Sequence, residues 1–190
     1  VNGGTTPYTY SWSTGATTQD ISSATANSYS VTVSDALSCS ASVSAIITEP
    51  NSLLLSTTQT DVSCYSGNNG AIDLSVSGGT AAYTYSWSGG MTSQDISNLT
   101  AGSYSVTVND VNACTASASI TITQPSTALS VSNTANHVSC YGGSNGDIAL
   151  TISGGTTFYS FIWNDGATSQ NRTSLPVGNY SVTVTDAHMC

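Results

Sequence analysis

The stretch that decides the fold is SYSVTVN, at residues 103–109. Its Tyr and two Val residues alternate with Ser and Thr, so in an extended chain the apolar side chains share one face. The same alternation appears on both sides of it, in AIDLSVS at 71–77 and in TASASITIT at 115–123. Such alternation is typical of antiparallel strands that are buried on one face.

Turn-forming residues separate these strands. GNNG occurs at 67–70, and SGG occurs at 77–79 and again at 88–90. Gly and Asn adopt the backbone conformations that tight turns require. Residues 53–59 and 83–87 are further candidate strands, and no segment has a sustained helical period. About seven short strands in a segment of this size predict a two-layer antiparallel sandwich.

The pattern recurs along the chain at a nearly constant interval. The phrase GGTTPYTYSW at 3–12 returns as GGTAAYTYSW at 78–87 and as GGTTFYSFIW at 154–163. The Trp residues that end these phrases are 75 and then 76 residues apart. A period of about 75 residues indicates a tandem array of one domain type. We therefore expect a partial repeat with later strands only at 1–50, a complete repeat at 51–125, and a partial repeat without its last strand at 126–190.

Two local features favour an immunoglobulin-like topology. A Trp closes the third predicted strand, where such sandwiches bury one. The run LTAGSY at 99–104 has the pattern of a tyrosine corner, in which a turn leads into a strand that begins with Tyr. The predicted fold class is therefore all-β, with tandem immunoglobulin-like antiparallel β-sandwiches. The recurring aromatic residues are predicted to lie in the cores: Trp12, Trp87, Trp163, Tyr29, Tyr104 and Tyr180.

Charge and composition exclude several classes of function. The chain has a single Lys or Arg, ten Asp or Glu, and a net charge of −9. Nucleic acid is excluded as a partner because binding it requires clustered basic residues. No apolar run is long enough to cross a membrane, so we expect no direct membrane insertion of this segment. No residues form a recognisable acid–base or nucleophilic constellation, so we expect no enzymatic activity and no catalytic residues.

The sequence also gives no strong signal for a metal or other cofactor. The cysteines lack the close pairs of zinc sites, and no dense run of Asp matches a calcium loop. Asp35, Asp110 and Asp186 recur just after a Tyr-led strand, and we interpret them as turn caps. Calcium (Ca²⁺) at a domain boundary is the one metal alternative that this reasoning leaves open.

Several runs together resemble a known repeat family. They are VSCYGGSNGDIALTISGGT at 138–156, AGSYSVTVND at 101–110 and ITITQP at 120–125, with the YSW-type aromatic phrase between them. Their combination is similar to the SprB-type repeat, which occurs in very large surface adhesins of gliding bacteria that use type IX secretion. The resemblance implies an extracellular, immunoglobulin-like building block of a long filament, and it implies no catalytic residues.

The five cysteines indicate an oxidising compartment and allow two pairing schemes. Within a repeat, Cys64 would pair with Cys114 and Cys140 with Cys190, each pair 50 residues apart, and Cys39 would pair with an upstream Cys. Across repeats, Cys39 would pair with Cys64 and Cys114 with Cys140. We favour the first scheme because it leaves each repeat self-contained.

Other polar residues have ordinary interpretations. Asn98, Asn171 and Asn179 begin N-x-S/T sequons and are candidate glycosylation sites. Arg172 stands where the other repeats have Ile, so we expect it near the rim of a core. His188 is expected in an exposed loop.

These observations predict an extracellular structural module of a long cell-surface adhesin or filament, a stiff disulfide-stapled rod for surface attachment or gliding. Its expected partners are other repeats of the same chain, with surface glycans and lateral copies of itself as further candidates. The alternative is a carbohydrate-binding module that uses the aromatic strand or the loop ends. Burial of the Trp rings distinguishes the two, because stacking on a sugar requires an exposed ring face.

Overall fold

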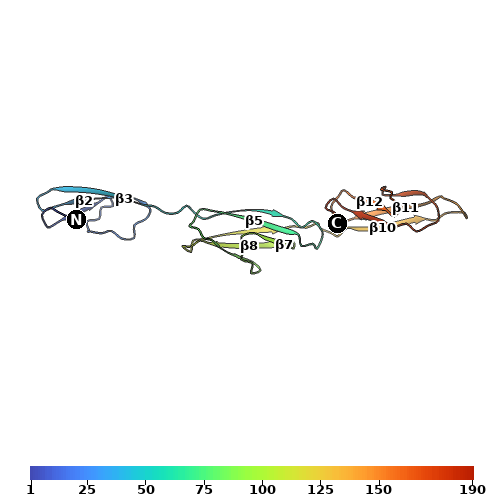
Figure 1. Cartoon of the computed structure of the whole chain (residues 1–190), viewed down its shortest axis with the longest axis horizontal. Helices are drawn as coiled ribbons and strands as arrows, with labels where there is room; N and C mark the ends of the chain where they lie inside the picture. The colour runs from blue at the N-terminus through green and yellow to red at the C-terminus, as the bar shows by residue number, and fades with distance from the viewer. The chain divides into compact units, whose positions relative to one another are not determined.

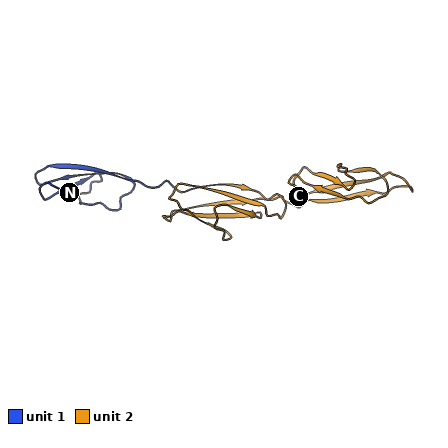
Figure 2. Cartoon of the chain, viewed as in Figure 1, with its two compact units in different colours: residues 1–52 blue, residues 53–190 orange.

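The computed structural model describes residues 1–190, and all of its regular secondary structure is β-strand (Figure 1). It has no helix that could cross a membrane. The chain divides into two compact units, residues 1–52 and residues 53–190 (Figure 2). The all-β fold class predicted from the alternation of apolar residues is confirmed.

Unit 1 is a single three-stranded antiparallel sheet. Its strands, in spatial order, are β1 (Thr9–Trp12), β2 (Asn27–Ser34) and β3 (Ser40–Ile47). Tyr29 and Val31 on the central strand are buried, whereas every residue of β3 is exposed.

The first repeat of unit 2 is a two-sheet sandwich. Its strands are β4 (Leu54–Thr60), β5 (Gly70–Ser77), β6 (Thr84–Trp87), β7 (Ile96–Leu99), β8 (Gly102–Asn109) and β9 (Thr115–Ile122). One sheet has the order β4-β5-β7 and the other the order β6-β8-β9. This is the immunoglobulin arrangement without the fourth strand, since such sandwiches pair their first, second and fifth strands in one sheet and their third, sixth and seventh in the other. Only residues 88–95 connect β6 to β7, which is too few for another paired strand and its turns.

The second repeat of unit 2 repeats this strand order. Its strands are β10 (Ser130–Asn136), β11 (Gly146–Ser153), β12 (Ser160–Trp163), β13 (Arg172–Leu175) and β14 (Val182–Thr185). They form a β10-β11-β13 sheet and a β12-β14 sheet, which match β4-β5-β7 and β6-β8.

The aromatic phrase forms the third strand of each sandwich in unit 2, and its Trp lies in the core. Trp87 and Trp163 are each 3% exposed. The indole N–H of Trp87 donates to the Ser93 carbonyl at 2.9 Å, and that of Trp163 donates to the Ser169 carbonyl at 2.8 Å. The partners of Trp87 in the core come from both sheets: Val62, Ile72, Leu74, Ile96, Leu99, Val106, Val108, Ile120 and Ile122. In unit 1, Trp12 is half-buried and makes the matching bond to Thr18 at 2.8 Å.

A tyrosine corner occurs in all three repeats. The Tyr29 hydroxyl donates to the Thr25 carbonyl at 2.8 Å and the Tyr104 hydroxyl to the Thr100 carbonyl at 2.9 Å. The Tyr180 hydroxyl donates to the Pro176 carbonyl at 3.1 Å. Each acceptor lies four residues upstream of its Tyr, as the turn-then-Tyr pattern predicts. Tyr29 is buried, and the other two are half-buried.

Strand β7 is an element that alternation did not reveal. Ile96 and Leu99 both point into the core although they are three residues apart. Asn98 between them has a positive φ of 58°, and the register with β5 shifts between Gly70 and Ala71. This irregularity turns Leu99 to the buried face and breaks the period-2 pattern.

We expect Trp87→Ala to lower the free energy of unfolding of its sandwich by about 3–5 kcal/mol, because it leaves a large cavity between the two sheets. Thr84→Ala, an exposed site on the same strand, is the control and should change stability by less than about 0.5 kcal/mol. Denaturant unfolding followed by circular dichroism measures both. A loss for Trp87→Ala no larger than that of the control contradicts a core role.

Candidate functional site

The most distinctive site in unit 2 is a disulfide between its two repeats. Cys64 and Cys190 are bonded, with a Cα–Cα distance of 5.7 Å and a sequence separation of 126 residues. Cys39, Cys114 and Cys140 are free and exposed. The predicted pairs Cys64–Cys114 and Cys140–Cys190 are therefore wrong, and so is the alternative that pairs Cys39 with Cys64 and Cys114 with Cys140.

The direction of the strands explains why the within-repeat scheme fails. Strands β4 and β9 run side by side in the same direction, because the Val62 N–H donates to the Thr123 carbonyl at 2.9 Å where both strands end. Cys64 follows the end of β4, whereas Cys114 precedes the start of β9. Eight residues of strand separate these ends by about 26 Å, far beyond the roughly 7 Å limit for bonded cysteines. Cys140 and Cys190 occupy the matching positions in the next repeat.

The Cys64 loop, residues 62–70, is held by its own hydrogen bonds. The Ser63 N–H donates to Asn69 Oδ1 at 3.0 Å, and Asn69 Nδ2 donates back to Ser63 Oγ at 2.7 Å. The Gly67 N–H donates to the Cys64 carbonyl at 2.9 Å. A Cβ on Gly67 would lie 2.9 Å from a Val62 methyl and 3.0 Å from the Cys64 carbonyl oxygen, so a larger residue there would displace the loop.

The Cys190 turn, residues 186–190, is built around a buried carboxylate. Asp186 Oδ1 accepts from the N–H groups of His188 and Cys190, both at 2.9 Å, and Oδ2 accepts from the Thr156 N–H at 2.8 Å. The Thr156 bond is the foremost cause that lowers the pKa of Asp186. Asp35 and Asp110 make the same three contacts in their own repeats, which confirms their interpretation as turn caps.

The loop and the turn also meet through a hydrogen bond, in which His188 Nδ1 donates to the Ser63 carbonyl at 3.2 Å. The same carbonyl oxygen lies 3.5 Å from the disulfide sulfur of Cys190. His188 is exposed, as expected, but it belongs to this junction. In the linker, the Gln124 side chain accepts from the Ser66 N–H at 2.9 Å, and the Thr127 carbonyl accepts from the Gly155 N–H at 3.0 Å. The disulfide and the anchored linker thus make two covalent connections between the repeats.

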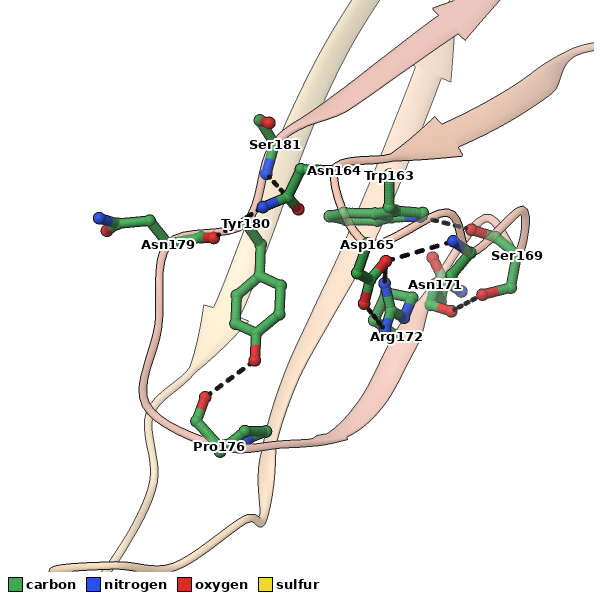
Figure 3. A network of polar contacts seen from close by, with 11 residues as sticks. Trp163, Asn164, Asp165, Ser169, Asn171, Arg172, Pro176, Asn179, Tyr180 and Ser181 are labelled. Atoms are coloured by element: carbon green, nitrogen blue, oxygen red, sulfur yellow. Dashed lines mark hydrogen bonds and ion pairs between the residues drawn. The ribbon is translucent and has the colours of Figure 1, made fainter.

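Arg172 caps the edge of a core instead of forming a binding site (Figure 3). Its guanidinium lies 5.4 Å from the centre of the Trp163 ring and donates to both carboxylate oxygens of Asp165, at 2.9 and 2.7 Å. The pair lowers the pKa of Asp165 and raises the pKa of Arg172. Arg172 stands where Ile96 closes the preceding core, so its stem and ring contact substitute for an apolar side chain.

The three sequon asparagines are all exposed. The side chain of Asn171 is already used within the fold, because its Oδ1 accepts a hydrogen bond from the Leu150 N–H at 3.0 Å. Asp95 makes the same bond to Leu74 in the preceding repeat, at 2.9 Å. Asn98 lies within β7, and Asn179 lies just before the Tyr180 corner. Glycosylation at Asn98, Asn171 and Asn179 stays a prediction.

Neither a metal cluster nor a ligand cavity stands out. The structure has no group of three or more His, Cys, Asp or Glu side chains that could hold a metal ion. A cavity of about 850 Å³ lies between the Cys140 loop and residues 175–180. Gly146 lines it, and the matching Gly70 of the preceding repeat is covered by the Ile122 side chain. The cavity therefore lies where the preceding repeat packs Ile122 into its core.

These features define the class of protein: tandem immunoglobulin-like β-sandwich repeats with a disulfide across the junction in unit 2. Residues 56–92 and 132–168 match the family model of the SprB repeat. These two stretches are therefore SprB-type repeats, as the run around Cys140 predicted. Each match includes one loop cysteine, Cys64 or Cys140. No curated protein matches the chain.

The pairing can be tested with trypsin, because Arg172 is the only Lys or Arg. After the free thiols are alkylated and the chain is denatured, cleavage separates residues 173–190 from the rest. We expect the two fragments to stay linked until reduction in the wild type and in Cys140→Ser, and to separate without reduction in Cys64→Ser. Mass spectrometry of the fragments measures this. If fragment 173–190 were instead released without reduction from Cys140→Ser and stayed linked in Cys64→Ser, the bond would be the within-repeat pair Cys140–Cys190.

The Asp186 cap predicts an acid-sensitive turn. Its folded-state pKa lies below 3.8, so ionised Asp186 stabilises the fold above that pH, and this stabilisation disappears as the pH falls through the folded-state pKa. Asp186→Asn should lower the thermal midpoint at neutral pH, and the difference from wild type should shrink as the pH approaches about 2. Thermal scans at several pH values measure it, with exposed Asp73→Asn as the control. A difference that is constant with pH contradicts the role of the carboxylate.

Proposed function

We propose that the chain is an extracellular structural module of a long cell-surface adhesin or filament, acting as a stiff, disulfide-stapled rod in surface attachment or gliding. The SprB-type repeat supports a surface adhesin-like module. The disulfide fits an oxidising, extracellular location. Its partners are other repeats of the same chain, with surface glycans and lateral copies as further candidates.

The observation that carries the proposal is the bond from Cys64 to Cys190. A linker alone leaves two sandwiches free to swivel, whereas a second covalent connection beside it restricts that motion. The linker residues Gln124 and Thr127 also restrict this motion, because their hydrogen bonds attach the linker to the two repeats. Repetition of such modules also multiplies weak surface contacts, because binding at one repeat raises the effective concentration of the next.

The carbohydrate-binding alternative receives little support from the aromatic strand. The rings of Trp87 and Trp163 are 3% exposed and cannot offer a face to a sugar. Tyr83 and Tyr159 on the same segments are half-buried, and their hydroxyls donate to the carbonyls of Gly78 and Gly154 at 2.6 and 2.8 Å. The proposal assigns the chain no enzymatic activity and no cofactor.

Force spectroscopy tests the mechanical role. In a chain pulled from residues 1 and 190, the disulfide carries the load directly from Cys64 to Cys190 and shields the 126-residue loop between them. At about 3.5 Å per extended residue, we expect reduction to release about 440 Å of additional contour length.

The matched control is Cys64→Ser, which should extend to the full length without any reductant. Cys140→Ser should behave like the oxidised wild type, because that thiol is free. An oxidised wild type that already extends as far as Cys64→Ser contradicts the load-bearing role.

A further inference from the structure

The free Cys140 belongs to a loop that is built like the bonded Cys64 loop. The Ser139 N–H donates to Asn145 Oδ1 at 3.1 Å, and Asn145 Nδ2 donates back to Ser139 Oγ at 2.9 Å. The Gly143 N–H donates to the Cys140 carbonyl at 3.0 Å, and a Cβ on Gly143 would lie 2.9 Å from a Val138 methyl. The hydrogen bonds that the Cys64 loop makes within itself are therefore reproduced around an exposed thiol.

The free Cys114 belongs to a turn that is built like the bonded Cys190 turn. Asp110 is buried, and its Oδ1 accepts from the N–H groups of Asn112 and Cys114 at 2.9 and 2.8 Å. Its Oδ2 accepts from the Thr80 N–H at 2.9 Å. The Cys39 turn has the same frame around Asp35.

Cys114 also has a neighbour that can replace His188. Asn112 occupies the position of His188, and its Nδ2 donates to Thr80 Oγ1 at 3.1 Å, just as His188 Nδ1 lies 3.4 Å from Thr156 Oγ1. An amide N–H can donate to the carbonyl that His188 contacts in the bonded junction. The Cys39 turn has Leu37 at this position and lacks that donor.

We propose that the loop and the turn are complementary halves of one docking surface. The loop half is presented by Cys64 and Cys140, and the turn half by Cys39, Cys114 and Cys190. The free halves each bind, and form a disulfide with, the opposite half of another SprB-type repeat, which a second copy of this chain can supply. The bonded Cys64–Cys190 junction shows that the two halves fit.

The surface is directional. The loop half lies at the end of the sandwich where β9 ends, and the turn half lies at the end where β9 begins. The loop half offers a backbone carbonyl, Ser63 or Ser139, and the turn half offers the donor at position 188 or 112. If two loop halves met, two carbonyl oxygens would face each other without a donor. If two turn halves met, the negatively charged Asp carboxylates of both turns would come close together. Pairing of unlike halves therefore joins repeats head to tail.

The covalent step requires an oxidant, for which glutathione disulfide is sufficient. The Cys140 thiolate attacks one sulfur of glutathione disulfide and releases one glutathione thiolate. The thiolate of Cys114 from the second copy then attacks the Cys140 sulfur of this mixed disulfide and releases the second glutathione. One disulfide forms, one is consumed, and the two electrons and two protons lost by the cysteines are recovered as two glutathione thiols.

The test is oxidation of the full chain at high concentration in a glutathione redox buffer, followed by non-reducing electrophoresis and mass spectrometry of linked peptides. We expect oligomers whose links join Cys140 to Cys114, and to a lesser extent Cys39, at least tenfold above links between like halves. Random pairing of one loop thiol and two turn thiols would give as many turn–turn as loop–turn links. That result, or a chain that stays monomeric, overturns the proposal.

Two variants separate docking from simple thiol reactivity. Cys140→Ser should abolish loop–turn links while it leaves Cys64–Cys190 intact. Asn145→Ala removes the bonds that shape the loop, and it should reduce linked product about tenfold although Cys140 reacts normally with a small thiol reagent. Equal yield from Asn145→Ala and wild type overturns the docking role. The inference depends on the junction and not on the proposed surface role, so contradiction of the rod in force spectroscopy leaves it standing.

Discussion

The parallel course of β4 and β9 is the constraint on which the arrangement of unit 2 depends. The bond from the Val62 N–H to the Thr123 carbonyl fixes their direction. It places the loop cysteine at one end of the sandwich and the turn cysteine at the other. A disulfide inside one repeat is then excluded by distance. The same separation makes a disulfide between consecutive repeats available, because the end of one sandwich meets the start of the next.

Two kinds of interaction stabilise this frame. Apolar faces of both sheets pack around Trp87, which contributes the largest buried ring of its core. Backbone N–H groups that no strand partner satisfies are instead bonded by side-chain oxygens, at Asp186, Asp110 and Asn69. The chain has almost no positive charge, yet the carboxylates of Asp110 and Asp186 are buried. Their loss of hydration is offset by hydrogen bonds from backbone amides instead of by ion pairs. The junction is made from the same turns that close the strands.

Much of the fold was predictable because it is encoded locally. Alternation located β5, β8 and β9, and the Gly-then-Tyr run identified the tyrosine corner at Tyr104. The recurrence of Asp just after each Tyr-led strand indicated a cap, since Asp bonds backbone amides two to four residues ahead. Strand β7 was missed because the positive φ of Asn98 breaks the two-residue period. Arg172 was expected at a rim, but its ring contact with Trp163 depends on a neighbouring strand.

The sequence alone determined the repeat, most of the strands and most of the residues that face inward, because these follow from short-range periodicity. It did not determine the disulfide. Cys64 is nearer in sequence to Cys114, yet its partner is Cys190, 126 residues away. That choice depends on which end of a sandwich each turn occupies, and hence on how the two sheets are stacked. Spacing along the chain carries no information about this direction, so only the tertiary structure could decide that the bond joins two repeats instead of closing one.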